Sequence, residues 1–585
     1  MTVVIGFSWP IEHDNSVAAI VDGRLVFAYE EERRTRHKHS PDEAPINSMV
    51  RLFEYLKGID IGPNDIDAYA VNFDNKLMTF SNKRSAYLRS LTRLPPEKYA
   101  GKEALKLVYK AFQGFNYLFL SKYLLSRVFN RLGVQFTKMP KVFPVEHHLS
   151  HAASAYFSGF NKCACVTLDG AGEEDSTVVW NFSNGNFEKI LAIHASFGSL
   201  GFLYEAAGKL LGYDNLEGPG KLMGLAPYGQ MSSFYDKLRE IVHIQDRQDL
   251  PYFISADKDL KRRNRFYIFK LFESKFPKKI NWNPRGELST DAANLAWATQ
   301  KVCEEAIIST AKWTRENVSS DNLVLSGGVA LNAKANMGLH YSKLFNDMFI
   351  FPAANDAGGP IGAAAYVYEH VLGEKMKNSR LRNVYLGPDY HDQVEKVVKE
   401  SKWNAEYVGD DTGKVAQMVA EGKIVTWYQG RCELGPRALG NRSIIADPRR
   451  KEMWRTLNQI KGREWWRPLA PSLLAEDAKD YFVDPVDHEF MILMFKFKEQ
   501  ASSRVPAVVH VDGTARPQTV TPELNKRWYD LIKSFKNITG EGLIINTSFN
   551  LAGEPLVETP YDALRSFSIG GFDAIYLDGW IIKKY

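Results

Sequence analysis

The sequence predicts a two-domain α/β protein whose first domain contains an internal duplication. Its 585 residues exceed the roughly 250–300 residues that one hydrophobic core supports, so at least two domains are expected. A unit of strand, polar turn, strand and strand occurs twice, at Val3–Tyr29 and Cys163–His194. Further strands run into glycine-rich turns and then helices, at Ser326–Asn332 and Pro352–Pro360. Two such hairpin units in a mixed α/β chain suggest a duplicated nucleotide-binding fold.

The first unit is defined by short apolar strands and one strong turn signal. Asp22-Gly23 separates two apolar runs and is a typical hairpin turn. Helices are assigned where apolar residues recur at helical spacing. The strands expected in this unit are Val3–Phe7, Asn15–Val21, Arg24–Tyr29, Ala68–Val71 and Val142–Val145. The expected helices are Ile46–Lys57, one or two helices within Leu105–Leu132, and His147–Phe157.

The second unit repeats this alternation, and a second domain follows it. Its expected strands are Cys163–Leu168, Ser176–Phe182, Phe187–His194, Asn322–Leu325 and Phe349–Phe351. Its expected helices are Ala293–Asn317 and Ile361–Leu372. Gly373–Arg382 is charged and polar without an apolar period, so it is the candidate linker. We therefore place one domain at residues 1–378 and a second α/β domain at 379–585.

Composition excludes several classes of protein. The net charge of +5 is small for 74 basic and 69 acidic side chains, so a dedicated nucleic-acid binder is disfavoured. Two basic runs stand out: Arg33–Lys38 and Lys261–Arg265. Both are expected to be solvated faces, with an anionic substrate as the alternative for the first. No leader pattern and no apolar stretch of about 20 residues is found, and four cysteines form no disulfide framework, so we expect a cytoplasmic protein without membrane contact.

A histidine pair gives the sharpest local signal. His147 and His151 are four residues apart, so on a helix both imidazoles fall on one face and can share one metal ion. A structural histidine pair is the alternative. Asp356 lies in a glycine-rich turn between a strand and a helix, where α/β proteins place their sites, and is the best third ligand. Two histidines and one aspartate would leave coordination positions open for substrate.

Anion-binding signals occur in both halves. Glycine-rich turns follow strands at Asp169–Glu173 and at Ser326–Asn332, and small residues let backbone N–H groups approach phosphates. No P-loop pattern is present. Arginines with glycine, proline and asparagine neighbours in the second domain indicate rigid loops that present guanidinium groups to phosphates or carboxylates, with structural salt bridges as the alternative. These segments are Gly430–Ser443, Asp447–Arg449, Lys461–Pro471, His510–Arg516 and Asn546–Asn550.

Taken together, the His147/His151 pair, the Asp356 turn and the Arg431–Ser443 block resemble the O-carbamoyltransferases of nodulation-factor and antibiotic biosynthesis. The resemblance runs from His13 to the Pro560 region. It implies an N-terminal domain with the duplicated fold of actin and the sugar kinases, in the branch used by tRNA threonylcarbamoyl transferases. It also implies a C-terminal domain of the YrdC type. The expected activity is ATP- and metal-dependent transfer of a carbamoyl group to a hydroxyl of a small-molecule natural product.

The resemblance assigns roles to individual residues. The C-terminal domain is expected to join ATP and carbamoyl phosphate into carbamoyl-adenylate, through Lys461, Arg516 and Ser548, with support from Arg437, Arg467 and Asn550. The N-terminal domain then transfers the carbamoyl group beside a metal on His147, His151 and Asp356, with iron expected and zinc or manganese equally admitted. Mg²⁺ is admitted with ATP. His13 is the candidate general base and Asp14 its orienting partner. The candidate nucleotide and phosphate contacts are Lys38, Asp169, Gly170, Gly172, Gly327, Gly328 and Asn332.

Three other functions remain open at this point. A tRNA threonylcarbamoyl-type transferase shares the metal site, a non-catalytic ATP-binding module shares the fold, and a sugar kinase is a weaker third. The mild net charge and the arginine-rich second domain favour the carbamoyltransferase. The acceptor is not readable from sequence; Asn72–Arg131 and Gln230–Pro284 are expected to shape its pocket. Whether the chain forms a homodimer also stays open.

Overall fold

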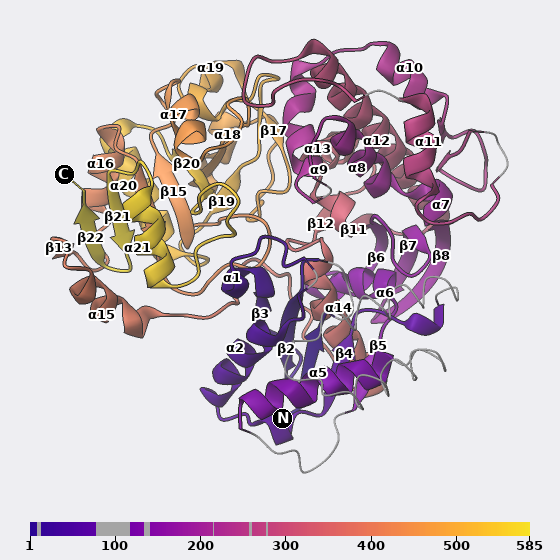
Figure 1. Ribbon diagram of the computed structural model, residues 1–585, viewed down its shortest axis with the longest axis horizontal. Coiled ribbons are helices and arrows are strands. Elements are labelled where there is room, and N and C mark those ends of the chain that lie inside the picture. Colours follow the sequence, from indigo (N-terminus) through magenta and orange to yellow (C-terminus); the bar gives the residue numbers. More distant parts are fainter. Residues whose placement is uncertain are drawn as a thin grey trace.

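The computed structural model describes residues 1–8, 13–41, 43–77, 117–133, 141–214, 216–256, 260–276 and 279–584 (Figure 1). Two five-stranded sheets and one eight-stranded sheet form the framework of this described part. In Figure 1 the eight-stranded sheet and its helices, coloured orange to yellow, form a body beside the two five-stranded sheets. The two-domain α/β class is confirmed, whereas the boundary after residue 378 stays a prediction.

The first sheet has the strand order β3-β2-β1-β4-β5. β1, β2 and β3 are antiparallel neighbours, and β4 and β5 run parallel to β1. Alternate residues of β1 enter different cores: Ile5 packs with Met49 and Leu52 of α2 (Ile46–Lys57), while Val4 belongs to the core on the other face. The strands are β1 (Val3–Phe7), β2 (Ser16–Val21), β3 (Arg24–Glu30), β4 (Ala68–Val71) and β5 (Val142–Pro144).

The second sheet repeats this topology strand for strand. Its order is β12-β11-β6-β7-β8, with β6, β7 and β8 antiparallel and with β11 and β12 parallel to β6. The predicted duplication is thereby confirmed, and the strand order is that of the actin and sugar-kinase fold. The strands are β6 (Lys162–Leu168), β7 (Asp175–Ser183), β8 (Asn186–His194), β11 (Asn322–Ser326) and β12 (Asp347–Ile350).

Helices link and cover the two sheets. The predicted helix His147–Phe157 is α-helical over α6 (His147–Ala152) and continues as the 3₁₀ turn Ala153–Phe157. Of the helix expected within Leu105–Leu132, α5 (Tyr117–Arg131) is observed and residues 105–116 lie outside the described part. Helix α14 (Gly359–Tyr366) ends in a π-helical turn, Val367–Val371, and packs against β1, β2 and β4 of the first sheet. The chain thus returns from the second sheet to the first.

Most of the remaining elements of the first domain surround the second sheet, whereas α1 follows β3 and packs against α2 of the first. The longest of them, α12 (Thr290–Asn317), contacts α8, α9, α10 and α13. Of the two regions expected to shape the acceptor pocket, the second is described except at 257–259 and 277–278, whereas the first lies largely outside. These elements are α1 (Glu31–Thr35), α7 (Ala195–Gly198), α8 (Leu200–Leu210), α9 (Gly218–Leu225), α10 (Ser233–Arg239), β9 (Val242–Ile244), β10 (Tyr252–Ile254), α11 (Tyr267–Lys275) and α13 (Ala333–Ser342).

The C-terminal sheet has the order β13-β22-β21-β14-β15-β20-β16-β19. Helices α16 and α20 pack together over a core in which the rings of Trp427 and Tyr576 stack with centroids 4.0 Å apart. Its strands are β13 (Ala405–Tyr407), β14 (Val425–Tyr428), β15 (Arg442–Ala446), β16 (Ala470–Leu474), β19 (Gln518–Val520), β20 (Leu543–Ser548), β21 (Ala574–Leu577) and β22 (Trp580–Lys583). Two short strands, β17 (Phe495–Lys496) and β18 (Thr514–Ala515), pair separately. The helices are α15 (His391–Ser401), α16 (Gly413–Ala420), α17 (Met453–Ile460), α18 (Ala478–Tyr481), α19 (Glu499–Ser502), α20 (Lys526–Thr539) and α21 (Pro560–Ile569).

Two further features bear on expectations from composition. Among the helices that the structure describes, none combines the length and the apolar character that crossing a bilayer requires. The four cysteines are buried free thiols. The expectation that they form no disulfide framework is therefore confirmed.

Candidate metal centre and anion-binding site

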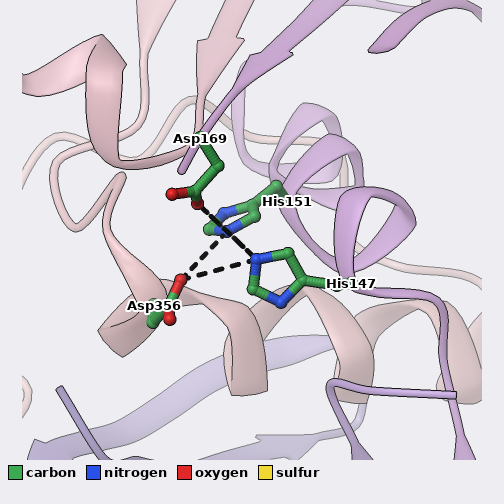
Figure 2. A group of neighbouring side chains, drawn as sticks. All are labelled: His147, His151, Asp169 and Asp356. Atoms are coloured by element: carbon green, nitrogen blue, oxygen red, sulfur yellow. Dashed lines mark hydrogen bonds and ion pairs between the residues drawn. The ribbon is translucent and has the colours of Figure 1, made fainter. Parts of the chain in front are cut away.

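Four side chains converge at one edge of the second sheet (Figure 2). His147 and His151 lie one turn apart on α6 and point the same way, as their spacing predicts. Asp169 directly follows β6, and Asp356 follows β12 in the 3₁₀ turn Asp356–Gly358. Because β6, β11 and β12 are parallel neighbours, their carboxyl ends meet at this edge, where α/β folds place their sites.

The spacing of the four donor groups suits a single divalent ion. The Nε2 atoms of His147 and His151 are 3.2 Å apart, and Nε2 of His151 is 3.1 Å from Asp169 Oδ2 and 3.5 Å from Asp356 Oδ1. Ligands at 2.0–2.1 Å around a tetrahedral ion would be separated by about 3.3–3.4 Å. Two imidazoles and two carboxylates are ligands that zinc, manganese and iron all accept. The residues present therefore fit a metal centre.

Charges around the cluster are strongly coupled. Burial lowers the pKa of His147, but the charges of Asp356 and Asp169 outweigh it and raise that pKa to about 9. Conversely, both histidines hold the pKa of Asp169 well below its usual range despite burial of the carboxyl group. Ser326 Oγ lies 3.4 Å from Nδ1 of His151, the ring nitrogen other than Nε2, which faces the candidate metal position. Glu173 accepts the backbone N–H of His147 at 3.0 Å and fixes the start of α6.

The structure places Asp169 with the candidate metal ligands, and the nucleotide contact expected of it stays a prediction. Its carboxylate also accepts the backbone N–H groups of Gly170, at 2.6 Å, and Gly328, at 3.3 Å. Gly327 has φ of 89°, and a Cβ at this position would lie 2.2 Å from the carbonyl oxygen of Leu168. Only glycine therefore lets the two strand ends approach closely enough to build the site.

The other predicted contacts of the first domain fall into two places. Gly172 lies against the rings of His147 and His148 and so flanks the metal cluster. Asn332 instead caps α13, where its side chain accepts the Ala335 N–H and exchanges two hydrogen bonds of 3.0 Å with Gln300. Its amide is thus engaged within the fold, and its nucleotide role stays a prediction.

His13 belongs to a short chain of charged groups beside the metal cluster. Asp14, in a left-handed conformation with φ of 54°, pairs with Nδ1 of His13 at 3.0 Å and with Nδ1 of His39 at 2.8 Å. Burial lowers the pKa of His13, but the hydrogen bond and charge of Asp14, aided by Asp356 and Asp169, raise it to about 10. The structure thus brings Asp14 to His13 as the orienting partner, and His39 joins them.

The second site lies in the C-terminal domain around Lys461. Its ammonium group contacts Ser548 Oγ at 3.2 Å, Asn550 Oδ1 at 2.9 Å and the carbonyl oxygens of both residues. Burial and the neighbouring charges of Arg463, Arg467 and Lys38 hold the pKa of Lys461 well below its usual range. Three of the predicted residues, Lys461, Ser548 and Asn550, are therefore in direct contact.

Arginines enclose this site with little acidic compensation. Burial and the charges of Arg437, Arg467 and Arg463 lower the pKa of Arg516, so the four guanidinium groups lie near one another. Buried nitrogen atoms of Arg437, Arg463 and Arg516 have no hydrogen-bond partner. Within the described residues, one carboxylate, that of Glu464, lies within ion-pair distance of the cluster, 3.7 Å from Arg467. A largely desolvated cluster of cations with a single neighbouring carboxylate favours an anionic ligand.

The two sites lie close together across the domain contact. Lys38 forms a 2.7 Å ion pair with Glu217 of the first domain, and its charge also lowers the pKa of Lys461 in the second. Its neighbour His39 pairs with Asp14, which holds His13 beside the metal cluster. One loop after α1 therefore adjoins both sites.

Two features were not predicted from the sequence: the membership of Arg463 in the cation cluster and the burial of Arg33. Arg463 was not singled out, although it lies between Lys461 and Arg467 in a segment recognised as anion-binding. The basic run Arg33–Lys38 was expected to be a solvated face, which is wrong for Arg33: it is 2% exposed and paired with Glu30 and Glu32. The acidic residues just before the run were the signal that could have indicated burial.

Comparison with known proteins identifies the class. The family description Carbamoyltransferase N-terminus matches residues 4–365, and Carbamoyltransferase C-terminus matches residues 416–584. The chain belongs to the carbamoyltransferase family, and it is an enzyme of carbamoyl transfer. The nodulation protein NolNO of Sinorhizobium fredii is 32% identical over 98% of this chain and 79% of its own. A protein of Synechocystis is 35% identical over 100% of this chain and 97% of its own.

Solved structures resemble the chain only distantly. Full-length HypF in its phosphate- and nucleotide-bound form superimposes with a TM-score of 0.35, at 13% identity, over 63% of this chain and 56% of its own. The fold assignment rests on the strand order of the two repeated sheets.

Proposed function

We propose that this carbamoyltransferase uses ATP and carbamoyl phosphate to carbamoylate a hydroxyl group of a small molecule, in two stages at two sites. The observation that carries the proposal is the cluster of buried Lys461 with the half-buried Arg463, Arg467, Arg516 and Arg437, five cations near which one carboxylate, that of Glu464, is found in the described part of the chain. ATP and carbamoyl phosphate are both phosphate anions, and guanidinium groups bind phosphate in two-pronged geometry. Such ligands would remove the charge imbalance.

In the first stage the cation cluster binds the phosphate groups of ATP and of carbamoyl phosphate. Water cleaves carbamoyl phosphate into carbamate and inorganic phosphate. A carbamate oxygen then attacks the α-phosphorus of ATP, pyrophosphate leaves, and carbamoyl-adenylate forms. Lys461 and Arg516 would stabilise the negative charge that develops on the phosphoryl oxygens, because preorganised donors act strongly where water is excluded. Ser548 and Asn550 hold the Lys461 ammonium group in place.

In the second stage the acceptor hydroxyl attacks the carbamoyl carbon, AMP leaves, and the hydroxyl proton passes to a base. His13 is the proposed base, oriented by Asp14. The pKa of His13, about 10, is raised partly by the charges of Asp356 and Asp169. A cation bound to these two carboxylates would offset their charge and so lower the pKa of His13 toward neutral pH, where an imidazole can accept a proton as a base. A divalent ion on His147, His151, Asp169 and Asp356 would supply positive charge for the adenylate phosphate.

Iron is the metal we propose, by the resemblance to the family, and the acceptor is proposed to be a natural product. The relative NolNO is a nodulation protein by name. The proposal places the acceptor beside the metal cluster, and it includes no nucleic acid because the net charge is only +5.

The test is pyrophosphate release from ATP, with and without carbamoyl phosphate and without acceptor. Release that requires carbamoyl phosphate and disappears in Lys461→Ala is expected. Lys396→Ala is the matched control, because Lys396 is exposed on α15 and pairs weakly, at 3.9 Å, with Glu400. Release that is independent of carbamoyl phosphate, or absent from folded, metal-loaded protein, would overturn the proposed first stage.

A further inference from the structure

The basic segment after β3 joins the first sheet to the C-terminal domain. Arg33 Nη2 donates to the carbonyl oxygen of Gly435 at 2.8 Å, and the N–H of Gly435 donates to Glu30 Oε2 at 3.2 Å. Arg33 is itself paired with Glu30 and Glu32. Both backbone polar groups of one residue are therefore held by a buried charged pair from the other domain, which we call the Glu30–Arg33 pair.

Gly435 stands between the two sites. It precedes Arg437 of the cation cluster by two residues, in the turn Gly435-Pro436-Arg437. On its other side a Cβ would lie 3.1 Å from the carbonyl oxygen of Pro352, in the turn that leads to Asp356. Its φ of 94° lies in the region that favours glycine, so the turn has a defined and constrained backbone.

The same strands also hold the Asp356 turn. Glu30 faces Ser16 across the β2–β3 ladder, and Ser16 Oγ donates to the carbonyl oxygen of Ala357 at 2.7 Å. Arg36, at the end of α1, donates to the carbonyl oxygens of Pro555 and Leu556, at 3.0 and 2.5 Å. Contacts to both sites therefore converge on the end of β3 and the start of α1.

We propose that Glu30 and Arg33 are positioning residues for phosphate binding: they fix the Gly435 turn and thereby orient Arg437 in the cation cluster. Neither residue touches substrate. The inference rests on the proposed function, because it assigns phosphates to that cluster. A buried ion pair is weak support for stability, since desolvation offsets most of its attraction. The two-pronged hold on a single residue, through the peptide units on both sides of Gly435, instead gives geometric precision, which catalysis by positioned charges requires.

The test measures binding of inorganic pyrophosphate by calorimetry, which needs no turnover. Arg33→Lys keeps the charge but loses the planar fork. It is expected to weaken pyrophosphate binding about tenfold and to raise KM for carbamoyl phosphate more than it lowers kcat, with metal content unchanged. Arg24→Lys is the matched control, because Arg24 is exposed at the start of the same strand.

Two further variants keep the inference falsifiable if Arg33→Lys does not fold. Gly435→Ala strains the turn without altering any charge, and it is expected to show the same loss of affinity. Glu30→Gln retains an oxygen for the Gly435 N–H and is expected to stay within about threefold of the natural protein. Wild-type affinity in folded Arg33→Lys and Gly435→Ala would overturn the inference. An equal loss of pyrophosphate affinity in Glu30→Gln would also overturn the inference, because it would assign the effect to the buried charge and not to the geometry of the Gly435 turn.

The outcomes also separate this inference from the proposed function. Natural protein that binds pyrophosphate but shows no release dependent on carbamoyl phosphate contradicts the proposed first stage alone. In that case the ranking of pyrophosphate affinities among the variants still decides whether the Glu30–Arg33 pair positions the cation cluster. Natural protein that binds no pyrophosphate overturns the inference, because no phosphate site would then exist to be oriented.

Discussion

Replacement of Arg516 by methionine is expected to stabilise the ligand-free protein while removing its response to pyrophosphate. The guanidinium group lies among Arg437, Arg463 and Arg467, and its Nε has no hydrogen-bond partner. An unsatisfied buried polar group costs about 1–3 kcal/mol, and more when charged. Replacing a buried ion pair by apolar residues of similar volume is neutral or stabilising by about 1–4 kcal/mol, and a side chain among like charges is held less favourably than one in such a pair. We therefore expect the free energy of unfolding to rise by about 1–3 kcal/mol.

Thermal unfolding with and without pyrophosphate measures both effects. Ligand at 100 times its Kd stabilises by about 2.7 kcal/mol. At roughly 2–4 °C per kcal/mol for a unit of about 200 residues, Tm of the natural protein should rise by about 5–11 °C. Arg516→Met should raise the ligand-free Tm by about 2–12 °C and respond little to pyrophosphate.

The control for this experiment is Arg565→Met, since the Arg565 side chain is 59% exposed and pairs at 3.2 Å with Glu554. It should leave both values unchanged, because exposed ion pairs contribute little. A lower ligand-free Tm in Arg516→Met, together with a full response to pyrophosphate, would refute the argument that this cluster is an unfilled anion site.

Three other predictions address the metal, stability and proton uptake. Asp169→Asn should weaken metal binding at least tenfold, measured as the metal content that remains after dialysis. Glu146→Gln is the control, because the Glu146 carboxylate pairs with Lys189, and it should keep its metal. If both variants retain as much metal as the natural protein, Asp169 is not a ligand. Burial lowers the pKa of His488 to about 3, and its Nε2 accepts the Ile492 N–H. Because the pKa of His488 in the folded protein lies below the unfolded value of 6.5, its contribution to the free energy of unfolding is complete above pH 6.5 and is lost as the pH falls toward 3, by about 3 kcal/mol at pH 4. Denaturant titrations at several pH values should show that the stability of His488→Gln depends less on pH. Burial lowers the pKa of Lys461, and a bound anion favours its charged form, so the protein should take up protons when it binds pyrophosphate. Calorimetry in buffers of different ionisation enthalpy measures this uptake. Equal binding heats in all buffers would contradict the prediction.

Local patterns in the sequence predicted the parts of the site that depend on local geometry. The spacing of His147 and His151 fixes both rings on one helical face, and the strand–turn–helix pattern places Asp356 at a strand end. Asp169 is different. It follows a strand in an equally clear pattern, but its meeting with Asp356 depends on the parallel pairing of β6 with β11 and of β11 with β12, which are distant from β6 in sequence.

The charged residues show the same limit. Arg33 and Arg463 each stand in a basic or arginine-rich segment, and sequence alone does not distinguish a solvated cation from a buried one. Burial of Arg33 depends on Glu30 and Glu32 nearby and on Gly435 some four hundred residues away. The duplication was predictable, because the strand, polar turn, strand and strand unit occurs in both halves; the strand order of each sheet depends on pairings that are distant in sequence.

The return of α14 to the first sheet has a mechanical consequence for the metal centre. Asp356 immediately precedes this helix, which packs on β1, β2 and β4, whereas Asp169 ends the central strand of the second sheet. An ion shared by both carboxylates would therefore act as a cross-link between the two repeats. Cross-links between residues far apart in sequence restrict the unfolded chain most. Chelation should accordingly loosen the repeats relative to each other as well as remove a reactive centre.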